Sequence, residues 1–166
     1  MESKNRNKEN RPKIPLYTPE QRRRRDESIW TTVQGVLAPL QFLVFLVSLV
    51  LVIRYLATGQ GEFAATVSVV IKTILLYAIM ITGAIWEREV FGRYLFAPVF
   101  FWEDVVSMLV MALHTAYIVV LLTGWFDVTT QMLIALVAYA SYLINAVQFL
   151  LKLRAARLAG QSPEVA

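Results

Sequence analysis

The sequence predicts an all-α, polytopic membrane protein: a four-transmembrane-helix bundle with a basic N-terminal tail and a surface helix. Of its 166 residues, 57% are hydrophobic and the mean hydropathy is +0.55, which is more apolar than a soluble domain of this size. Four apolar runs have about the twenty residues needed to cross a 30 Å hydrocarbon core, and they cover approximately residues 34–56, 64–86, 101–122 and 131–151. The chain contains no cysteine, which excludes disulfides and thiolate metal sites.

Residues 1–33 precede the first span and carry nine of the sixteen Lys and Arg residues. We expect the polar residues 1–15 to be disordered. Thr18-Pro19-Glu20 has the pattern of a helix start, which predicts a basic helix from Glu20 to about Thr32 along the membrane surface. A basic tail can bind nucleic acid, but few aromatics and the adjoining apolar runs favour anionic lipid headgroups. We therefore predict the lipid bilayer as a partner, and no nucleic acid.

The distribution of Lys and Arg predicts the topology. Fourteen of the sixteen lie in the N-terminal tail, in the link between the second and third spans, or in the basic C-terminal tail, residues 152–166. The other two loops contain none, and only Arg54 borders the first. Because cytoplasmic loops carry the excess of positive charge, both termini are expected to be cytoplasmic.

Polar residues within the spans are regularly spaced. In the first span they recur every seven residues, at Gln34, Gln41, Ser48 and Tyr55, and in the fourth they include Ser141, Asn145 and Gln148. Such stripes face other helices rather than lipid. We expect Gln41, Asn145 and Gln148 to line a pocket in the cytoplasmic half of the bundle. Lys72 lies deep in the second span, where it either snorkels outward, the reading we favour, or serves a substrate or an ion pair.

The third span carries the strongest candidates for chemistry. It begins with Glu103 and Asp104 and contains the only histidine, His114. Glu103 and His114 share one helix face, about 16 Å apart along the axis. Ionisable groups in a membrane span are by default a functional-site hypothesis, although acids in a first helical turn also simply complement the helix dipole.

These residues limit the reaction classes. The sequence has no phosphate-binding Gly-rich loop, no paired metal-ligand histidines and no nucleophile elbow. A carboxyl group kept neutral by apolar surroundings is a good general acid, and His114 is equally suited to ligate a tetrapyrrole metal or to form a structural hydrogen bond. The residues alone therefore indicate a membrane enzyme or a pigment-binding protein that uses acid–base groups.

Four blocks of the chain resemble the 3-vinyl (older name 2-vinyl) bacteriochlorophyllide hydratases of phototrophic bacteria. The blocks are LYTPEQRRRRDESIW, QGVLAPLQFLVFLVSLVLVIRYLATG, TGAIWEREVFGRYLFAPVFFWEDVVSMLVMALHTAY and YLINAVQFLLKLRAARL. The resemblance covers about residues 16–158. It implies addition of water to the 3-vinyl group of chlorophyllide or bacteriochlorophyllide, giving a 3-(1-hydroxyethyl) group, in the bacterial inner, intracytoplasmic photosynthetic membrane. It also implies neighbouring pigment-biosynthesis enzymes as partners.

This chemistry suggests roles for the candidate residues. Glu103 is expected to donate the proton and Asp104 to act as base or to stabilise the cation, with reversed roles, or Glu87 in either role, as open alternatives. The reaction moves no electrons, so we expect no cofactor, and the only metal expected is the magnesium of the substrate.

The remaining candidates are expected to bind the pigment. His114 would ligate the substrate magnesium or position the ring, and Arg93 or Arg88 would pair with its propionate carboxylate. The aromatic residues Trp86, Trp102 and Phe101 would stack on the macrocycle, unless they only anchor the helices at the interface. The main rival hypothesis is a non-enzymatic pigment-carrying or assembly subunit, and a third is a small transporter or quinone-binding subunit.

Overall fold

The computed structural model describes residues 16–160, with side chains as far as Ala155. This part of the chain forms five helices: α1 (Pro19–Glu27), α2 (Ile29–Thr58), α3 (Glu62–Phe91), α4 (Phe101–Thr123) and α5 (Val128–Gly160). Residues 1–15, which we expect to be disordered, lie outside the described residues, as do the last residues of the C-terminal tail. The predicted division into a tail, a bundle and a C-terminal segment remains a prediction.

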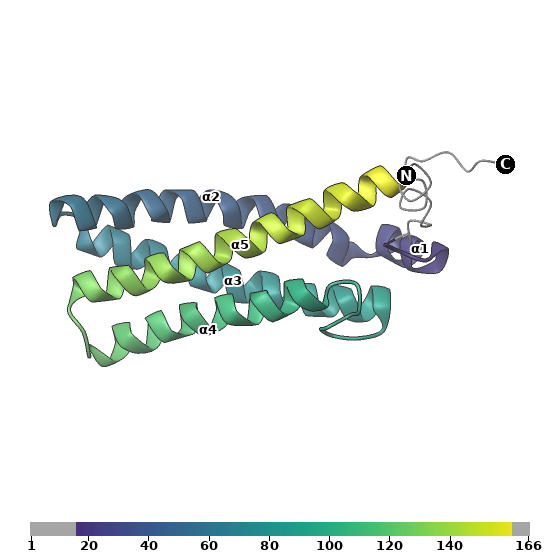
Figure 1. Cartoon of the computed structure of the whole chain (residues 1–166). Helices are drawn as coiled ribbons and strands as arrows, with labels where there is room; N and C mark the ends of the chain where they lie inside the picture. Colours follow the sequence, from purple (N-terminus) through teal and green to yellow (C-terminus); the bar gives the residue numbers. More distant parts are fainter. Residues whose placement is uncertain (1–15, 161–166) are drawn as a thin grey trace, which may run out of the picture.

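Helices α2 to α5 form an antiparallel bundle, in which α2 packs mainly on α3 and α4 mainly on α5 (Figure 1). All four are long and apolar enough to cross a membrane, which confirms the predicted fold class. Helix α1, the α3–α4 link and the last turns of α5 lie at one end of the bundle. We call this the α1 end; the α2–α3 turn and the α4–α5 loop are at the opposite end.

Helix α1 begins where the sequence predicts but ends earlier. Thr18 and Gln21 form a reciprocal capping box, with Pro19 in the first turn. The helix ends at Glu27 rather than near Thr32, because Ser28 is extended and its hydroxyl accepts a hydrogen bond from the Trp30 amide, which starts α2. The first membrane helix is therefore longer than expected, and α1 is a separate short helix.

The bundle interior combines small and aromatic side chains. Ala65, Ala135 and Ala138 are buried, which permits close approach of the helix backbones. Phe45 packs against the rings of Tyr139 and Tyr142, at 5.4 and 4.9 Å between centroids. The outer face carries exposed aliphatic side chains on all four long helices, including Leu43, Val50, Ile74, Leu109, Leu133 and Val137. Such a surface fits lipid.

Candidate active site

Two carboxyl groups from different helices meet at the α1 end of the bundle. Glu87 lies in the last turns of α3 and Asp104 in the first turn of α4, and only 5% and 3% of their surfaces are exposed. Their carboxyl groups lie close enough to interact with each other. Two buried carboxylates repel each other, which favours the state in which one of them carries a proton. We call Glu87 and Asp104 the acid pair.

The α3–α4 link, residues 92–100, covers the acid pair. Gly92 ends α3 in a left-handed conformation, with φ of 79°. Phe96 is also left-handed, with φ of 59°, a costly conformation for a bulky residue. The Phe96 N–H donates to Asp104 Oδ2 at 2.7 Å, and the next N–H, that of Ala97, donates to Glu87 Oε2 at 3.2 Å. Two consecutive N–H groups of the link therefore bind one carboxyl group each of the acid pair.

Glu103 points away from the acid pair, toward α5. Its Oε2 is 2.6 Å from Lys152 Nζ, and its backbone carbonyl accepts hydrogen bonds from Asn145 Nδ2 and Ser107 Oγ, at 3.0 and 2.8 Å. Lys152 also donates to the Val99 carbonyl in the link. The adjacent acids of the sequence are therefore separated, because neighbouring residues on a helix project about 100° apart.

Lys152 is a site residue that the sequence analysis missed. A signal was available, since Lys152 follows Asn145 and Gln148 at i+7 and i+4 on the polar stripe of the last helix. It was interpreted only as part of the basic C-terminal segment.

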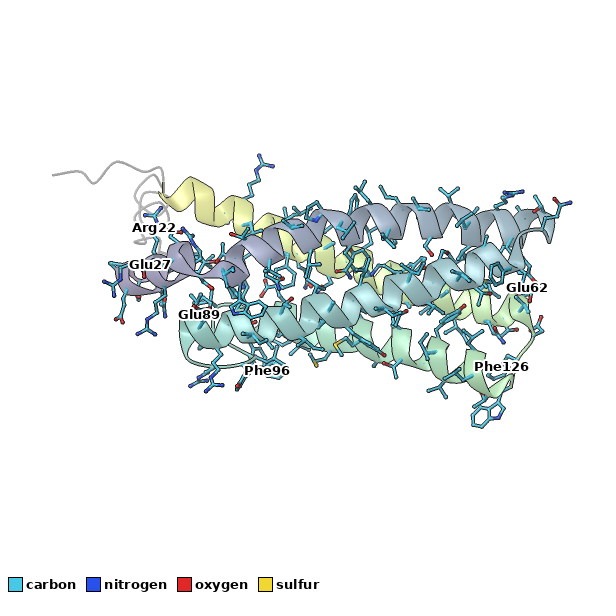
Figure 2. The ribbon with its side chains drawn as sticks, turned by 180° about the vertical axis from the view of Figure 1, so that it is seen from behind. Arg22, Glu27, Glu62, Glu89, Phe96 and Phe126 are labelled. Atoms are coloured by element: carbon cyan, nitrogen blue, oxygen red, sulfur yellow. The ribbon has the colours of Figure 1, made fainter. Side chains whose placement is uncertain are left out.

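Aromatic and basic side chains surround the link. Phe96 and Trp102 lie on either side of Phe101, at 5.8 and 5.5 Å between ring centroids, and Trp102 is 69% exposed. Arg88 donates to the Tyr94 hydroxyl, and Arg93 is exposed. Figure 2 shows Phe96 and Glu89 toward the end that carries α1, with Glu62 and Phe126 at the opposite end.

Trp86 differs from the other candidate stacking residues because it packs within the protein. Its ring meets Phe91 and Phe100, both at 5.8 Å between centroids, and its Nε1 donates to Thr31 Oγ1 at 2.9 Å. The exposed aromatic surface near the acid pair is therefore formed by Tyr94, Phe96, Phe101 and Trp102, and we call it the aromatic patch.

His114 lies deeper in the bundle and is not part of the acid pair. It is fully buried, and its Nδ1 is 2.8 Å from the Val110 carbonyl oxygen. Because that oxygen only accepts, a neutral His114 ring carries its hydrogen on Nδ1. Its Nε2 has no hydrogen-bond partner within residues 16–155. Ten residues separate Asp104 from His114, which is about 15 Å along the helix.

Lys72 is fully buried rather than snorkelling outward, so the favoured expectation was wrong. It lies on the inward stripe of α3 with Val69 and Leu76, and its Nζ is 3.7 Å from the centroid of the Tyr142 ring. The reason is its register on the helix: a side chain on the inward face, near the middle of the span, cannot reach the interface. The ammonium group instead meets an aromatic face.

The three amide side chains expected to line a pocket differ in their hydrogen bonds, and the pocket remains a prediction. Asn145 accepts from Ser107 Oγ at 3.2 Å and donates to the Glu103 carbonyl, so it belongs to the surroundings of Glu103. The Gln41 Nε2 and Gln148 Oε1 atoms are buried without hydrogen-bond partners in the described part of the chain. Among the same residues, no three His, Cys, Asp or Glu side chains are grouped to hold a metal ion.

Comparison with known proteins identifies the family. The sequence model of a family described as 2-vinyl bacteriochlorophyllide hydratase matches residues 17–155, which include the acid pair, the link and Lys152. The chain belongs to the 2-vinyl bacteriochlorophyllide hydratase family. The predicted resemblance is thereby confirmed.

Two similar proteins have the same name as this family. The 2-vinyl bacteriochlorophyllide hydratase of Rhodobacter capsulatus is 65% identical over 149 residues, covering 90% of this chain and 86% of the relative. The hydratase of the same name from Cereibacter sphaeroides is 67% identical over 147 residues, covering 89% of this chain and 91% of the relative. No solved structure matches the chain.

Proposed function

We infer that this protein is a hydratase that adds water across the 3-vinyl group of a chlorophyllide or bacteriochlorophyllide, giving a 3-(1-hydroxyethyl) group. The inference rests on membership of the hydratase family and on relatives of that name with 65% and 67% identity. The structural observation that carries the mechanism is the acid pair, two buried carboxyl groups that consecutive amides of the link hold close together. This activity is that of a hydro-lyase.

The reaction needs one proton donor and one proton acceptor. The protonated carboxyl of the acid pair gives its proton to the terminal vinyl carbon, which becomes a methyl group. The cation left on the inner carbon is delocalised into the macrocycle and stabilised by the carboxylates beside it. Water attacks this carbon, and its released proton returns to the acid pair. Atoms and charge balance without electron transfer, so we propose that no cofactor takes part and that magnesium belongs to the substrate.

We assign the roles of proton donor and base differently from the expectation based on the sequence. Glu103 was the expected proton donor, but its carboxylate forms an ion pair with Lys152, and a carboxylate in an ion pair has no proton to give. Glu87 and Asp104 are buried close together, and mutual repulsion favours the state in which one of the two carries a proton. We therefore place acid and base within the acid pair and give Glu103 a supporting role beside it.

We propose that the macrocycle stacks on the aromatic patch. Phe101 and Trp102 present rings at the start of α4, three and two residues before Asp104. Arg93, which is exposed in the link, and Arg88 offer guanidinium groups to the propionate carboxylate of the pigment. His114, about 15 Å along α4 from Asp104, then has a structural role rather than ligating magnesium.

We propose that the four long helices cross the intracytoplasmic photosynthetic membrane with both termini in the cytoplasm. The distribution of Lys and Arg supports this orientation. The acid pair and the aromatic patch then lie near the cytoplasmic leaflet, where enzymes acting earlier and later on the same pigment can deliver and remove it.

The direct test is a mass measurement. Purified protein in detergent is incubated with a 3-vinyl chlorophyllide, without nucleotide, flavin or oxygen. We expect a product heavier by one water, and we expect a 3-ethyl analogue to bind and remain unchanged. A pigment carrier would bind both compounds and alter the mass of neither, and that outcome would overturn the proposal.

A further inference from the structure

Lys152 makes two contacts that join three parts of the chain. Its Nζ forms the ion pair with Glu103 in the first turn of α4, and it also donates to the carbonyl of Val99 in the link. The same ammonium lies 5.1 Å from the centroid of the Phe100 ring. Its side chain and that of Glu103 are only 23% and 11% exposed. A half-buried ammonium with two oxygen partners is held in place more firmly than one in a surface ion pair.

The part of the link that Lys152 contacts lies close in sequence to the amides that bind the acid pair. Val99 lies two residues after Ala97, whose N–H donates to Glu87 and whose carbonyl accepts from the Phe100 amide at 2.8 Å. The preceding N–H, that of the left-handed Phe96, donates to Asp104. A left-handed bulky residue persists only when surrounding contacts hold it. The contact between Lys152 and Val99 is such a restraint, and it comes from a different helix.

We propose that Lys152 is a positioning residue for the hydration: by holding the Val99 carbonyl, it keeps the link folded so that its amides orient the acid pair. Glu103 fixes the ammonium in the position that this requires, and Asn145, on the same helix as Lys152, anchors the Glu103 backbone. Lys152 does not touch the reacting atoms. The proposal rests on the proposed hydratase function and adds a residue to its machinery.

The test compares Lys152→Met with Lys152→Arg, using Arg154→Met as matched control. Arg154 is an exposed cation on the same helix, so its replacement removes the same charge without touching the link. For Lys152→Met we expect kcat to fall about ten- to a hundredfold, the cost of displaced catalytic groups. KM should rise by a smaller factor than kcat falls, because Phe101 and Trp102 belong to α4 and keep their position, whereas Tyr94 and Phe96 move with the link. Lys152→Arg should restore most of kcat, because a guanidinium can reach both oxygens.

Hydrogen exchange supplies a readout that does not depend on turnover. Peptides covering residues 93–100 should exchange faster in Lys152→Met than in the wild type, and at the wild-type rate in Arg154→Met. A Lys152→Met protein with wild-type kcat, or with unchanged exchange in this link, would overturn the proposal.

A double variant distinguishes two possible roles of Lys152: holding the link in place and neutralising the charge of Glu103. Lys152→Met leaves the Glu103 carboxylate buried and unpaired, which costs stability, whereas Glu103→Gln/Lys152→Met removes both charges and so protects the fold. If Lys152 works by holding the link, kcat of the double variant stays low. If Lys152 only neutralises Glu103, kcat of the double variant recovers, and the positioning role is wrong. Inactivity of the wild-type protein would instead refute the proposed function.

Discussion

Glu87→Gln is the substitution that most cleanly removes the transferable proton from the acid pair. The amide oxygen of a glutamine can still accept from the Ala97 N–H, 3.2 Å from Glu87 Oε2, and its NH₂ group can donate to Asp104 in place of the shared proton. Both hydrogen bonds of the side chain are therefore conserved. The free energy of unfolding should change by less than about 1 kcal/mol, the net value of one hydrogen bond.

The kcat of Glu87→Gln should change far more than its stability. General acid catalysis contributes about two to four orders of magnitude in rate, which corresponds to about 3 to 5 kcal/mol of activation free energy. We therefore expect kcat of Glu87→Gln to fall by about that factor, with pigment binding retained. Asp104→Asn should fall comparably. Because the two groups share one proton, the double variant should be no slower than the worse single variant.

The assay is single-turnover conversion of a 3-vinyl chlorophyllide, monitored by product mass, together with thermal unfolding in the same detergent. Glu89→Gln is the matched control, since Glu89 lies two residues further along α3 and accepts from Ser28 Oγ, a contact that an amide oxygen can also make. It should retain wild-type turnover. Near-normal kcat in Glu87→Gln would refute the acid-pair mechanism. A large loss of stability in Glu87→Gln would refute the claim that glutamine keeps both hydrogen bonds of the side chain.

Three further predictions test the surroundings of the site. His114→Gln should hydrate and bind pigment within about twofold of the wild type, as expected for a site distant from the reaction; loss of pigment affinity would favour magnesium ligation. Lys72→Met should have an equal or higher Tm in detergent, because it removes a buried ammonium that has no carboxylate partner among the described residues; a clear fall in Tm would contradict this. A cysteine at Ser3 should react only with reagents that reach the cytoplasm, and one at Gln60 only from outside; any other pattern would overturn the topology.

The membrane helices could be predicted from the sequence because the period and length of apolar runs dictate them. The third span was expected at about 101–122 and is observed at Phe101–Thr123. The first span differed because its start depends on one hydrogen bond, from the Trp30 amide to Ser28, which apolar periodicity does not record. Lys72 could have been assigned to the inward face, since Ala65, Val69 and Leu76 share its helical stripe.

The residue types of the candidate site could be predicted from the sequence, but the contacts between these side chains could not. The sequence analysis names Asp104 and Glu87 as candidate acids or bases, yet nothing in the sequence shows that they meet. That contact depends on the path of the link, and the path depends on a left-handed Phe96, which local propensity disfavours. The ion pair of Glu103 likewise depends on Lys152, which is 49 residues away in the sequence.

The central claim is that a carboxyl group of the acid pair protonates the terminal vinyl carbon, and isotope labelling tests it most directly. Wild-type protein and the Glu87→Gln/Asp104→Asn variant are given a 3-vinyl chlorophyllide in heavy water, without reductant or oxygen, and the product is analysed by mass and by NMR. The account predicts one non-exchangeable deuterium in the new methyl group for the wild type, and hardly any product for the variant. A requirement for reductant or oxygen, a methyl group without deuterium, or a fully active double variant would contradict it.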